Sequence, residues 1–167
     1  GEIAGAADLD RAKYDAHVEE DGDSLAYQAS VVEAVAAAGR IAGVGTIAYS
    51  LRDTDGAGMG VYDADGGEKP GASALARAFE PVQAFLVSPD SGWSEVVVCN
   101  DLPTELSAEL HWEAGERSGD ESISVRAGER WRGGPIDLPT EADAERLDVR
   151  TDAGSVANEY KRSGRRP

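Results

Sequence analysis

Two aspartate-rich segments have the residue spacing in this sequence that most suggests a bound ion. Asp53-Thr54-Asp55-Gly56 and Asp63-Ala64-Asp65-Gly66 place carboxylates on alternate residues ahead of a glycine, as calcium-binding loops do. Neither segment continues into the full calcium loop with its terminal glutamate. Because aspartate and glycine are also favoured in turns, the sequence predicts two turns rather than a calcium site.

The other residue types that ligate metals or act as nucleophiles are isolated. His17 and His111 have no partner at metal-ligand spacing. Ser50 and Ser73 lack the Gly-x-Ser-x-Gly setting of a nucleophilic serine. The single cysteine, Cys99, excludes an internal disulfide, and its apolar surroundings predict a small buried side chain. We therefore expect no metal and no cofactor.

Three tryptophans are suited to a carbohydrate-binding platform: Trp93, Trp112 and Trp131. Trp112, however, alternates with Leu110 at the period of two that a strand requires. Core packing is therefore the favoured interpretation, and a platform is the alternative.

The charge balance excludes several classes of partner. The 167 residues include 32 acidic and 16 basic residues, so the formal net charge is −16. Nucleic acids and anionic membranes both attract basic surfaces, so neither is an expected partner. The sequence has only 3 lysines. An acidic surface poor in lysine indicates salt adaptation of the kind found in halophilic archaea, because salt screens carboxylate repulsion. An ordinary acidic protein from a GC-rich genome is the alternative.

The first half of the chain has the pattern of an α/β protein. Apolar residues recur at helical spacing over residues 8–18 and 24–40, and Pro70 opens a third helix that runs to about Phe79. Between the second and third helices, residues 44–51 are continuously apolar, which predicts a parallel strand buried on both faces. A loop rich in glycine and aspartate follows from Asp53 to Gly67.

The pattern changes after Pro81 to short segments of period two, separated by Gly, Pro, Asp and Asn. Six or seven strands at this spacing predict an antiparallel β-sandwich of the immunoglobulin type. We therefore expect three parts: an α/β domain over 1–82, a β-sandwich over 83–160 and a polar tail over 161–167. The predicted strands are 83–87, 95–99, 107–112, 122–125, 146–149 and 156–160.

Several short motifs resemble family 2 glycoside hydrolases, especially the β-mannosidase branch. Gly45–Asp53 is similar to the family's last barrel strand, and Val96–Asp101 is similar to the apolar strand ending in Asn-Asp that opens its C-terminal sandwich. The motifs follow the family's order over residues 2–115. The remaining elements that carry the resemblance are Tyr27-Gln28, Met59–Asp63 with Gly66, Lys69-Pro70 and Ala78–Val82.

The resemblance implies both a fold and an activity. The chain would supply the last βα units of a (β/α)8 barrel, followed by the sandwich. The whole enzyme would hydrolyse a terminal β-glycosidic bond with retention, using two glutamates. The second glutamate would lie on barrel strand 4, which this chain lacks, so the chain alone is expected to be inactive and to need the remainder of the barrel as its partner. The alternative is a free-standing sandwich that binds carbohydrate or protein.

The resemblance also implies roles for particular residues. Glu2 stands where the family has its nucleophile. Tyr49 would stack on a sugar ring at the carboxyl end of the last barrel strand, the end that faces the substrate. Arg52 and Asp53 would hydrogen-bond sugar hydroxyls or pair with each other. Tyr49, Ser50, Arg52 and Met59 depart from the family's usual residues.

The ends of the sequence carry two further expectations. No signal peptide is visible, although a chain that starts inside a longer protein would not show one in any case. The location is left open, and a cytoplasmic one is favoured. The sequence begins at Gly1 rather than Met, which indicates a start inside a longer protein.

Overall fold

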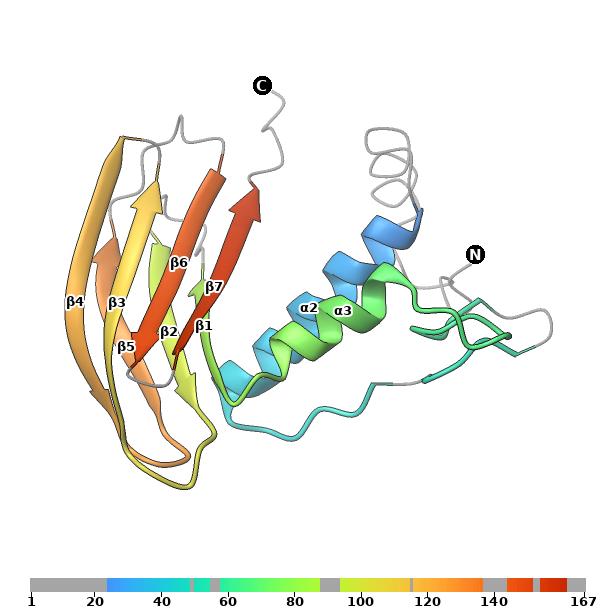
Figure 1. Cartoon of the computed structure of the whole chain (residues 1–167), viewed down its shortest axis with the longest axis horizontal. Coiled ribbons are helices and arrows are strands. Elements are labelled where there is room, and N and C mark those ends of the chain that lie inside the picture. The colour runs from blue at the N-terminus through green and yellow to red at the C-terminus, as the bar shows by residue number, and fades with distance from the viewer. Residues whose placement is uncertain are drawn as a thin grey trace. The chain divides into compact units, whose positions relative to one another are not determined.

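The chain divides into two compact units, Gly1–Glu80 and Pro81–Pro167. The computed structural model describes residues 24–48, 50–54, 58–87, 94–114, 116–136, 144–151 and 154–161 (Figure 1). The predicted helix at 8–18, and the candidate residues Glu2, Tyr49 and Trp93, lie outside these ranges.

The first unit contains two helices in its described part, α2 (Ser24–Ala42) and α3 (Pro70–Ala78), which confirms both of these predictions. Gly43 directly follows α2, and its φ of 70° is the left-handed conformation that glycine adopts readily after a helix. Helix α3 begins at Pro70, where the missing N–H of proline costs no hydrogen bond. The two helices lie side by side (Figure 1).

Small side chains bring the two helices close together. Ala36 on α2 and Ala74 and Ala78 on α3 are each 1% exposed. A buried cation lies beside them: Arg40 Nη1 donates a hydrogen bond of 2.5 Å to the carbonyl oxygen of Ala78. This bond satisfies a carbonyl in the last turn of α3.

The prediction of a buried strand at 44–51 is wrong for this chain. Residues 44–48 form no strand, and the side chains of Val44, Ile47 and Leu51 are 61%, 94% and 71% exposed. A strand buried on both faces needs neighbouring strands and covering layers. The described part of this unit has two helices and isolated bridges but no sheet, so the apolar segment has no sheet to enter.

The second unit is a sandwich of two antiparallel sheets, which confirms the predicted class. One sheet has the strand order β1-β2-β5 and the other β4-β3-β6-β7 (Figure 1). The strands are β1 (Val82–Val87), β2 (Ser94–Asn100), β3 (Leu106–Ala114), β4 (Arg117–Val125), β5 (Arg130–Ile136), β6 (Ala144–Thr151) and β7 (Gly154–Lys161).

The strand order differs in one respect from the constant-type immunoglobulin domain. That domain places its fourth strand in the same sheet as the first, second and fifth. Here β4 pairs with β3 in the other sheet. Strand β5 was not among the six predicted strands, although the predicted total allowed for a seventh.

Both sheets contribute to one hydrophobic core, because alternate side chains on each strand point inward. The sheet of β1 and β2 supplies Val82, Ala84, Val96 and Val98. The sheet of β3 and β4 supplies Leu106, Ala108, Leu110, Ile123 and Val125. Cys99 is buried, as predicted.

No helix within the described ranges is both long enough and apolar enough to cross a membrane.

Candidate functional site

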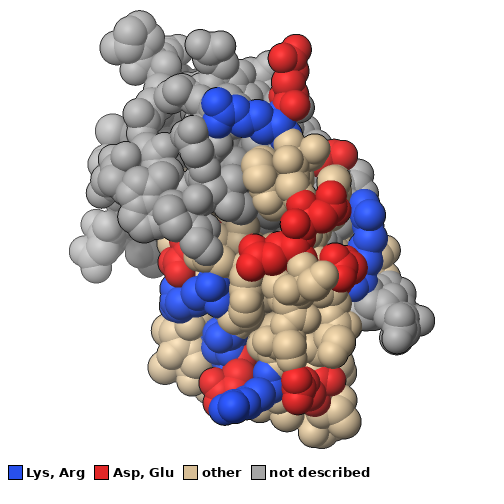
Figure 2. All heavy atoms as spheres, turned by 90° about the vertical axis from the view of Figure 1, so that its left-hand side faces the viewer, with Lys and Arg blue, Asp and Glu red and all other residues tan. Residues whose placement is uncertain are grey.

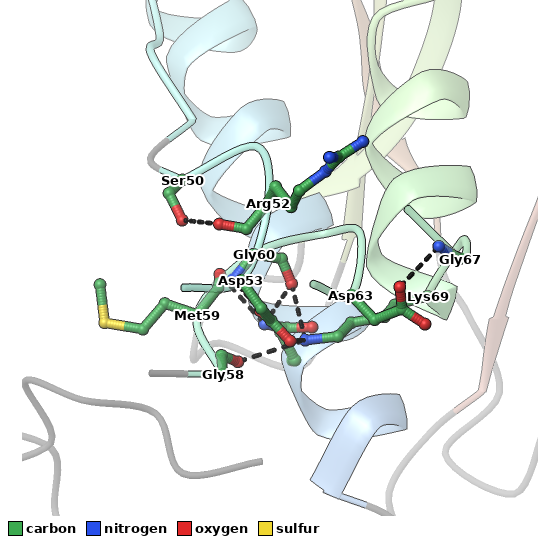
Figure 3. Close-up of polar contacts among 10 residues, drawn as sticks. Ser50, Arg52, Asp53, Gly58, Met59, Gly60, Asp63, Gly67 and Lys69 are labelled. Atoms are coloured by element: carbon green, nitrogen blue, oxygen red, sulfur yellow. Dashed lines mark hydrogen bonds and ion pairs between the residues drawn. The ribbon is translucent and has the colours of Figure 1, made fainter. Parts of the chain in front are cut away.

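A partly buried ion pair lies at the end of the exposed apolar segment. Lys69 Nζ lies 2.5 Å from Asp53 Oδ2, and the two side chains are 10% and 15% exposed (Figure 3). Lys69 Nζ also donates to the carbonyl oxygens of Gly60 at 3.1 Å and Gly58 at 3.4 Å. The ammonium group therefore binds one carboxylate and two carbonyls, which suits its three donors.

The second carboxylate oxygen of Asp53 is also occupied. Asp53 Oδ1 accepts a hydrogen bond of 2.7 Å from the Gly60 N–H. The hydrogen bond from Lys69 is the main cause that lowers the pKa of the Asp53 carboxyl, and the bond from Gly60 acts in the same direction. Asp53 is therefore held as a carboxylate that joins residue 60 to residue 69.

Helix α2 reaches the same cluster through a buried amide. Gln28 Nε2 donates to the carbonyl oxygens of Met59 and Gly60, both at 3.3 Å. Gln28 Oε1 is buried and has no hydrogen-bond partner within the described part of the chain. Gln28, Asp53, Gly60 and Lys69, which come from three different motifs of the sequence, thus form one polar cluster.

Gly60 is required by the close approach of two backbone segments. A Cβ atom at this position would lie 2.3 Å from both the carbonyl carbon of Arg52 and the amide nitrogen of Asp53. Main-chain hydrogen bonds hold the same segments together, from Asp53 N to Tyr62 O at 2.9 Å and from Tyr62 N to Leu51 O at 3.0 Å. The end of the apolar segment is therefore fixed by backbone contacts as well as by the ion pair.

The second aspartate-rich segment is a turn, as predicted. Asp63 Oδ1 accepts a hydrogen bond of 2.6 Å from Gly67 N, and Asp63 O accepts one of 3.1 Å from Gly66 N. Gly66 has a φ of 92°, which favours glycine. The first aspartate-rich segment includes residues 55–56, which lie outside the described ranges.

Arg52 and Asp53 do not pair with each other. Asp53 pairs with Lys69, whereas the guanidinium group of Arg52 points away from the ion pair (Figure 3). It lies over Gly66, where an added Cβ would come within 3.0 Å of Arg52 Nη2. Sequence analysis did not identify the roles of Gln28, Gly60 and Lys69, although all three occur in the motifs that carry the family resemblance.

Two tryptophans of the sandwich pack against its core, as the favoured interpretation held. Trp112 lies against Gly119 on the neighbouring strand, where an added Cβ would be 2.5 Å from Trp112 Nε1. Trp131 lies against Gly133 of its own strand, where an added Cβ would be 2.7 Å from Trp131 Cη2.

A second polar cluster surrounds His111 on strand β3. His111 Nδ1 lies 2.8 Å from Asp120 Oδ1 on β4, and His111 Nε2 lies 3.1 Å from Glu113 Oε1. Hydrogen bonds to Glu113 and then to Asp120 raise the pKa of His111. Both ring nitrogens thus face carboxylates, and within the described ranges no group of His, Cys, Asp or Glu forms a metal site.

The described surface carries charges of both signs. On the face shown in Figure 2, Asp and Glu side chains are interspersed with Lys, Arg and uncharged residues. On the three-stranded sheet, Arg132 Nη1 lies 3.1 Å from Glu95 Oε2 and Arg130 Nη2 lies 3.4 Å from Asp101 Oδ1. Exposed pairs of this kind contribute little to stability, at most about 1 kcal/mol each.

Comparison with known proteins gives structural matches only. No protein-family model matches the sequence, and no curated protein matches it. The β-D-mannosidase from Dictyoglomus thermophilum matches with a TM-score of 0.53 and 18% identity, over 62% of this chain and 14% of that one. A structure of the exo-β-D-glucosaminidase CsxA matches with a TM-score of 0.53 and 19% identity, over 71% of this chain and 15% of that one. This chain therefore spans about a seventh of the length of these two proteins, and at such identities the similarity is one of fold.

Proposed function

We propose that this chain is the C-terminal part of a retaining glycoside hydrolase similar to the family 2 β-mannosidases. In this proposal residues 1–82 complete a (β/α)8 barrel, and the sandwich follows it. The substrate is a carbohydrate with a terminal β-glycosidic bond, and the remainder of the barrel is the partner of this chain.

One observation supports the proposal. An exposed apolar segment that pairs with no sheet in the described part of the chain leads directly into the polar cluster around Asp53 and Lys69. Val44, Ile47 and Leu51 are mostly exposed, whereas Asp53, two residues further on, is held by Lys69 and Gly60. Exposing a large apolar side chain forgoes about 1.5–3 kcal/mol of burial free energy. A strand with neighbours on both sides would recover this energy, and the remainder of a barrel would supply those neighbours.

The chemistry requires residues from both parts of the proposed barrel. Glu2 is the proposed nucleophile, which attacks the anomeric carbon to form a glycosyl-enzyme intermediate. The acid/base carboxylate comes from the remainder of the barrel, so the chain alone is inactive. In this proposal Tyr49 stacks on the sugar, and the Asp53–Lys69 pair holds the end of the apolar segment that carries Tyr49.

A free-standing binding module is the second candidate. The self-contained core of the sandwich favours it, because both sheets contribute to one cluster. That proposal gives no reason for the exposure of Val44, Ile47 and Leu51. It also leaves Trp112 and Trp131 packed on the core rather than free to bind a sugar.

Hydrolysis by the longer protein tests the proposal. The substrate is an aryl β-mannoside in high salt, and the variants are Glu2→Gln and, as a matched control, Glu116→Gln in an exposed turn of the sandwich. Glu2→Gln should lower kcat on the order of 10,000-fold or more, as loss of a nucleophile does, while Glu116→Gln should match the wild type. Equal turnover by both variants would contradict the assignment of Glu2.

A further inference from the structure

We infer that Arg52 is a specificity-determining residue that selects a sugar bearing an anionic group, either a carboxylate or a sulfate. The inference rests on the proposed function, which places the carboxyl end of residues 44–53 toward the substrate. Sequence analysis predicted the same role, binding of sugar hydroxyls, for Arg52 and for its neighbour Asp53. The inference gives the two residues different roles.

Both oxygens of Asp53 already hold the loop. Its Oδ2 lies 2.5 Å from Lys69 Nζ, and its Oδ1 accepts the Gly60 N–H at 2.7 Å. The charge of the carboxylate is matched by the ammonium group of Lys69. Asp53 therefore positions the site rather than binding in it.

Arg52 is in the opposite situation. Its side chain is exposed, and within the described ranges its guanidinium has neither a hydrogen bond nor an ion pair, although the sequence has 32 acidic residues. The backbone that carries the group is held in place. Arg52 bridges to Tyr62, and its carbonyl accepts a hydrogen bond of 3.1 Å from Ser50 Oγ (Figure 3). The guanidinium lies near Gly66, where an added Cβ would be 3.0 Å from Arg52 Nη2.

The chemistry of the free group indicates the class of ligand. A guanidinium presents a planar fork of donors that matches the paired oxygens of a carboxylate or sulfate, and such charge-assisted bonds are stronger than bonds to neutral hydroxyls. A neutral hydroxyl would leave the charge of this guanidinium unmatched, whereas an anionic substituent would match it.

The test compares three aryl β-glycosides of the same sugar: the neutral mannoside, its uronide and its 6-sulfate. The longer protein is assayed as wild type, Arg52→Gln, Arg52→Lys and the control Arg132→Gln, whose arginine pairs with Glu95 on the sandwich. The measured quantity is the ratio of kcat/KM for each anionic substrate to kcat/KM for the neutral one.

In Arg52→Gln this ratio should fall about 10- to 100-fold, the effect of one charge-assisted hydrogen bond. Arg52→Lys should retain part of the preference, because it keeps the charge but loses the fork. The anionic substrate with the larger loss identifies the group that is bound. Arg132→Gln should leave the ratio as in the wild type.

Two results would overturn the inference in distinguishable ways. Turnover with the same ratio in wild type and Arg52→Gln would refute the role of Arg52 alone, as would a wild-type preference for the neutral mannoside over both anionic substrates. Failure of the wild type to hydrolyse any of the three would refute the proposed function and, with it, this inference.

Discussion

Replacing Asn100 by alanine should strongly destabilise the sandwich. Asn100 is fully buried at the end of β2. Its Nδ2 donates to the carbonyl oxygens of Thr104 and Val125, both at 2.9 Å, and to that of Arg126 at 3.2 Å. Its Oδ1 accepts a hydrogen bond of 3.0 Å from the Leu102 N–H. One side chain therefore joins β2, the end of β4 and the loop that leads into β3.

The size of the effect follows from these contacts. A typical internal hydrogen bond has a net value of about 0.5–1.5 kcal/mol, and a buried polar group left without a partner costs about 1–3 kcal/mol. Removing the Asn100 amide leaves the Leu102 N–H and three backbone carbonyl groups without the hydrogen bonds that the amide makes. We expect a loss of about 2–4 kcal/mol. In a unit of this size each kcal/mol lowers Tm by about 4–8 °C, so the expected fall is at least about 8 °C.

Tryptophan fluorescence is the appropriate assay. All three tryptophans lie in the second unit, so a fluorescence melting curve follows the sandwich and not the helices. Thr104→Ala is the matched control, because its exposed side chain changes while its carbonyl still accepts the bond from Asn100. A Tm for Asn100→Ala within about 2 °C of both the wild type and this control would refute the reasoning.

Three other predictions concern the loop, the histidine and the charge. Gly60→Ala should destabilise the first unit by about 1–3 kcal/mol, because its Cβ would meet the backbone of residues 52–53, whereas Gly45→Ala has open space and should be neutral. Helical circular dichroism on heating measures this, and equal melting of the two variants would count against the close contact. Glu113 and Asp120 raise the pKa of His111 above its ordinary value of about 6.5. The protonated imidazole therefore adds its whole contribution to the free energy of unfolding below about pH 6.5, and this contribution is lost as the pH rises through the raised pKa. The pKa of His111 measured by NMR should therefore lie above its ordinary value, and replacing His111 by Gln should flatten the fall in fluorescence Tm between about pH 6 and about pH 8.5. A pKa below the ordinary value would contradict this prediction. It would show that burial and the positive charge of Arg150, which lies opposite Glu109 on β6, outweigh the two carboxylates. Finally, the net charge of −16 should make the fluorescence Tm higher in about 3 M than in about 0.1 M KCl, and an unchanged midpoint would contradict salt adaptation.

The sequence predicted correctly the helices that have clear start and stop signals and the strands in which apolar and polar residues alternate. Helices α2 and α3 follow from apolar spacing, a terminal glycine and an initial proline, and six strands follow from alternation. Strand β5 contains Gly133, Gly134 and Pro135, residues that usually interrupt strands. It forms because it pairs with β2 and because Trp131 covers Gly133, both of which depend on tertiary structure.

In the candidate site, too, the sequence showed which residues are neighbours along the chain but not which residues pair in the folded structure. The sequence places Arg52 and Asp53 next to each other, and charge alone suggests that they pair. Asp53 instead finds Lys69, sixteen residues further along, because backbone bonds between the two segments and the absence of a side chain at Gly60 bring Lys69 to it. The exposure of Val44, Ile47 and Leu51 was unpredictable for a different reason: apolarity indicates that a segment should be buried, but not whether the burying partner is present.

The most direct test of the central claim is covalent trapping of the proposed intermediate. The longer protein is incubated with an activated 2-deoxy-2-fluoro-β-mannoside, which slows breakdown of a glycosyl-enzyme, and the adduct is mapped by mass spectrometry of the intact protein and of its peptides. The account predicts one added sugar, attached to Glu2. An adduct on another carboxylate would contradict the assignment of Glu2, and no adduct in a protein that hydrolyses the mannoside would contradict the retaining mechanism itself.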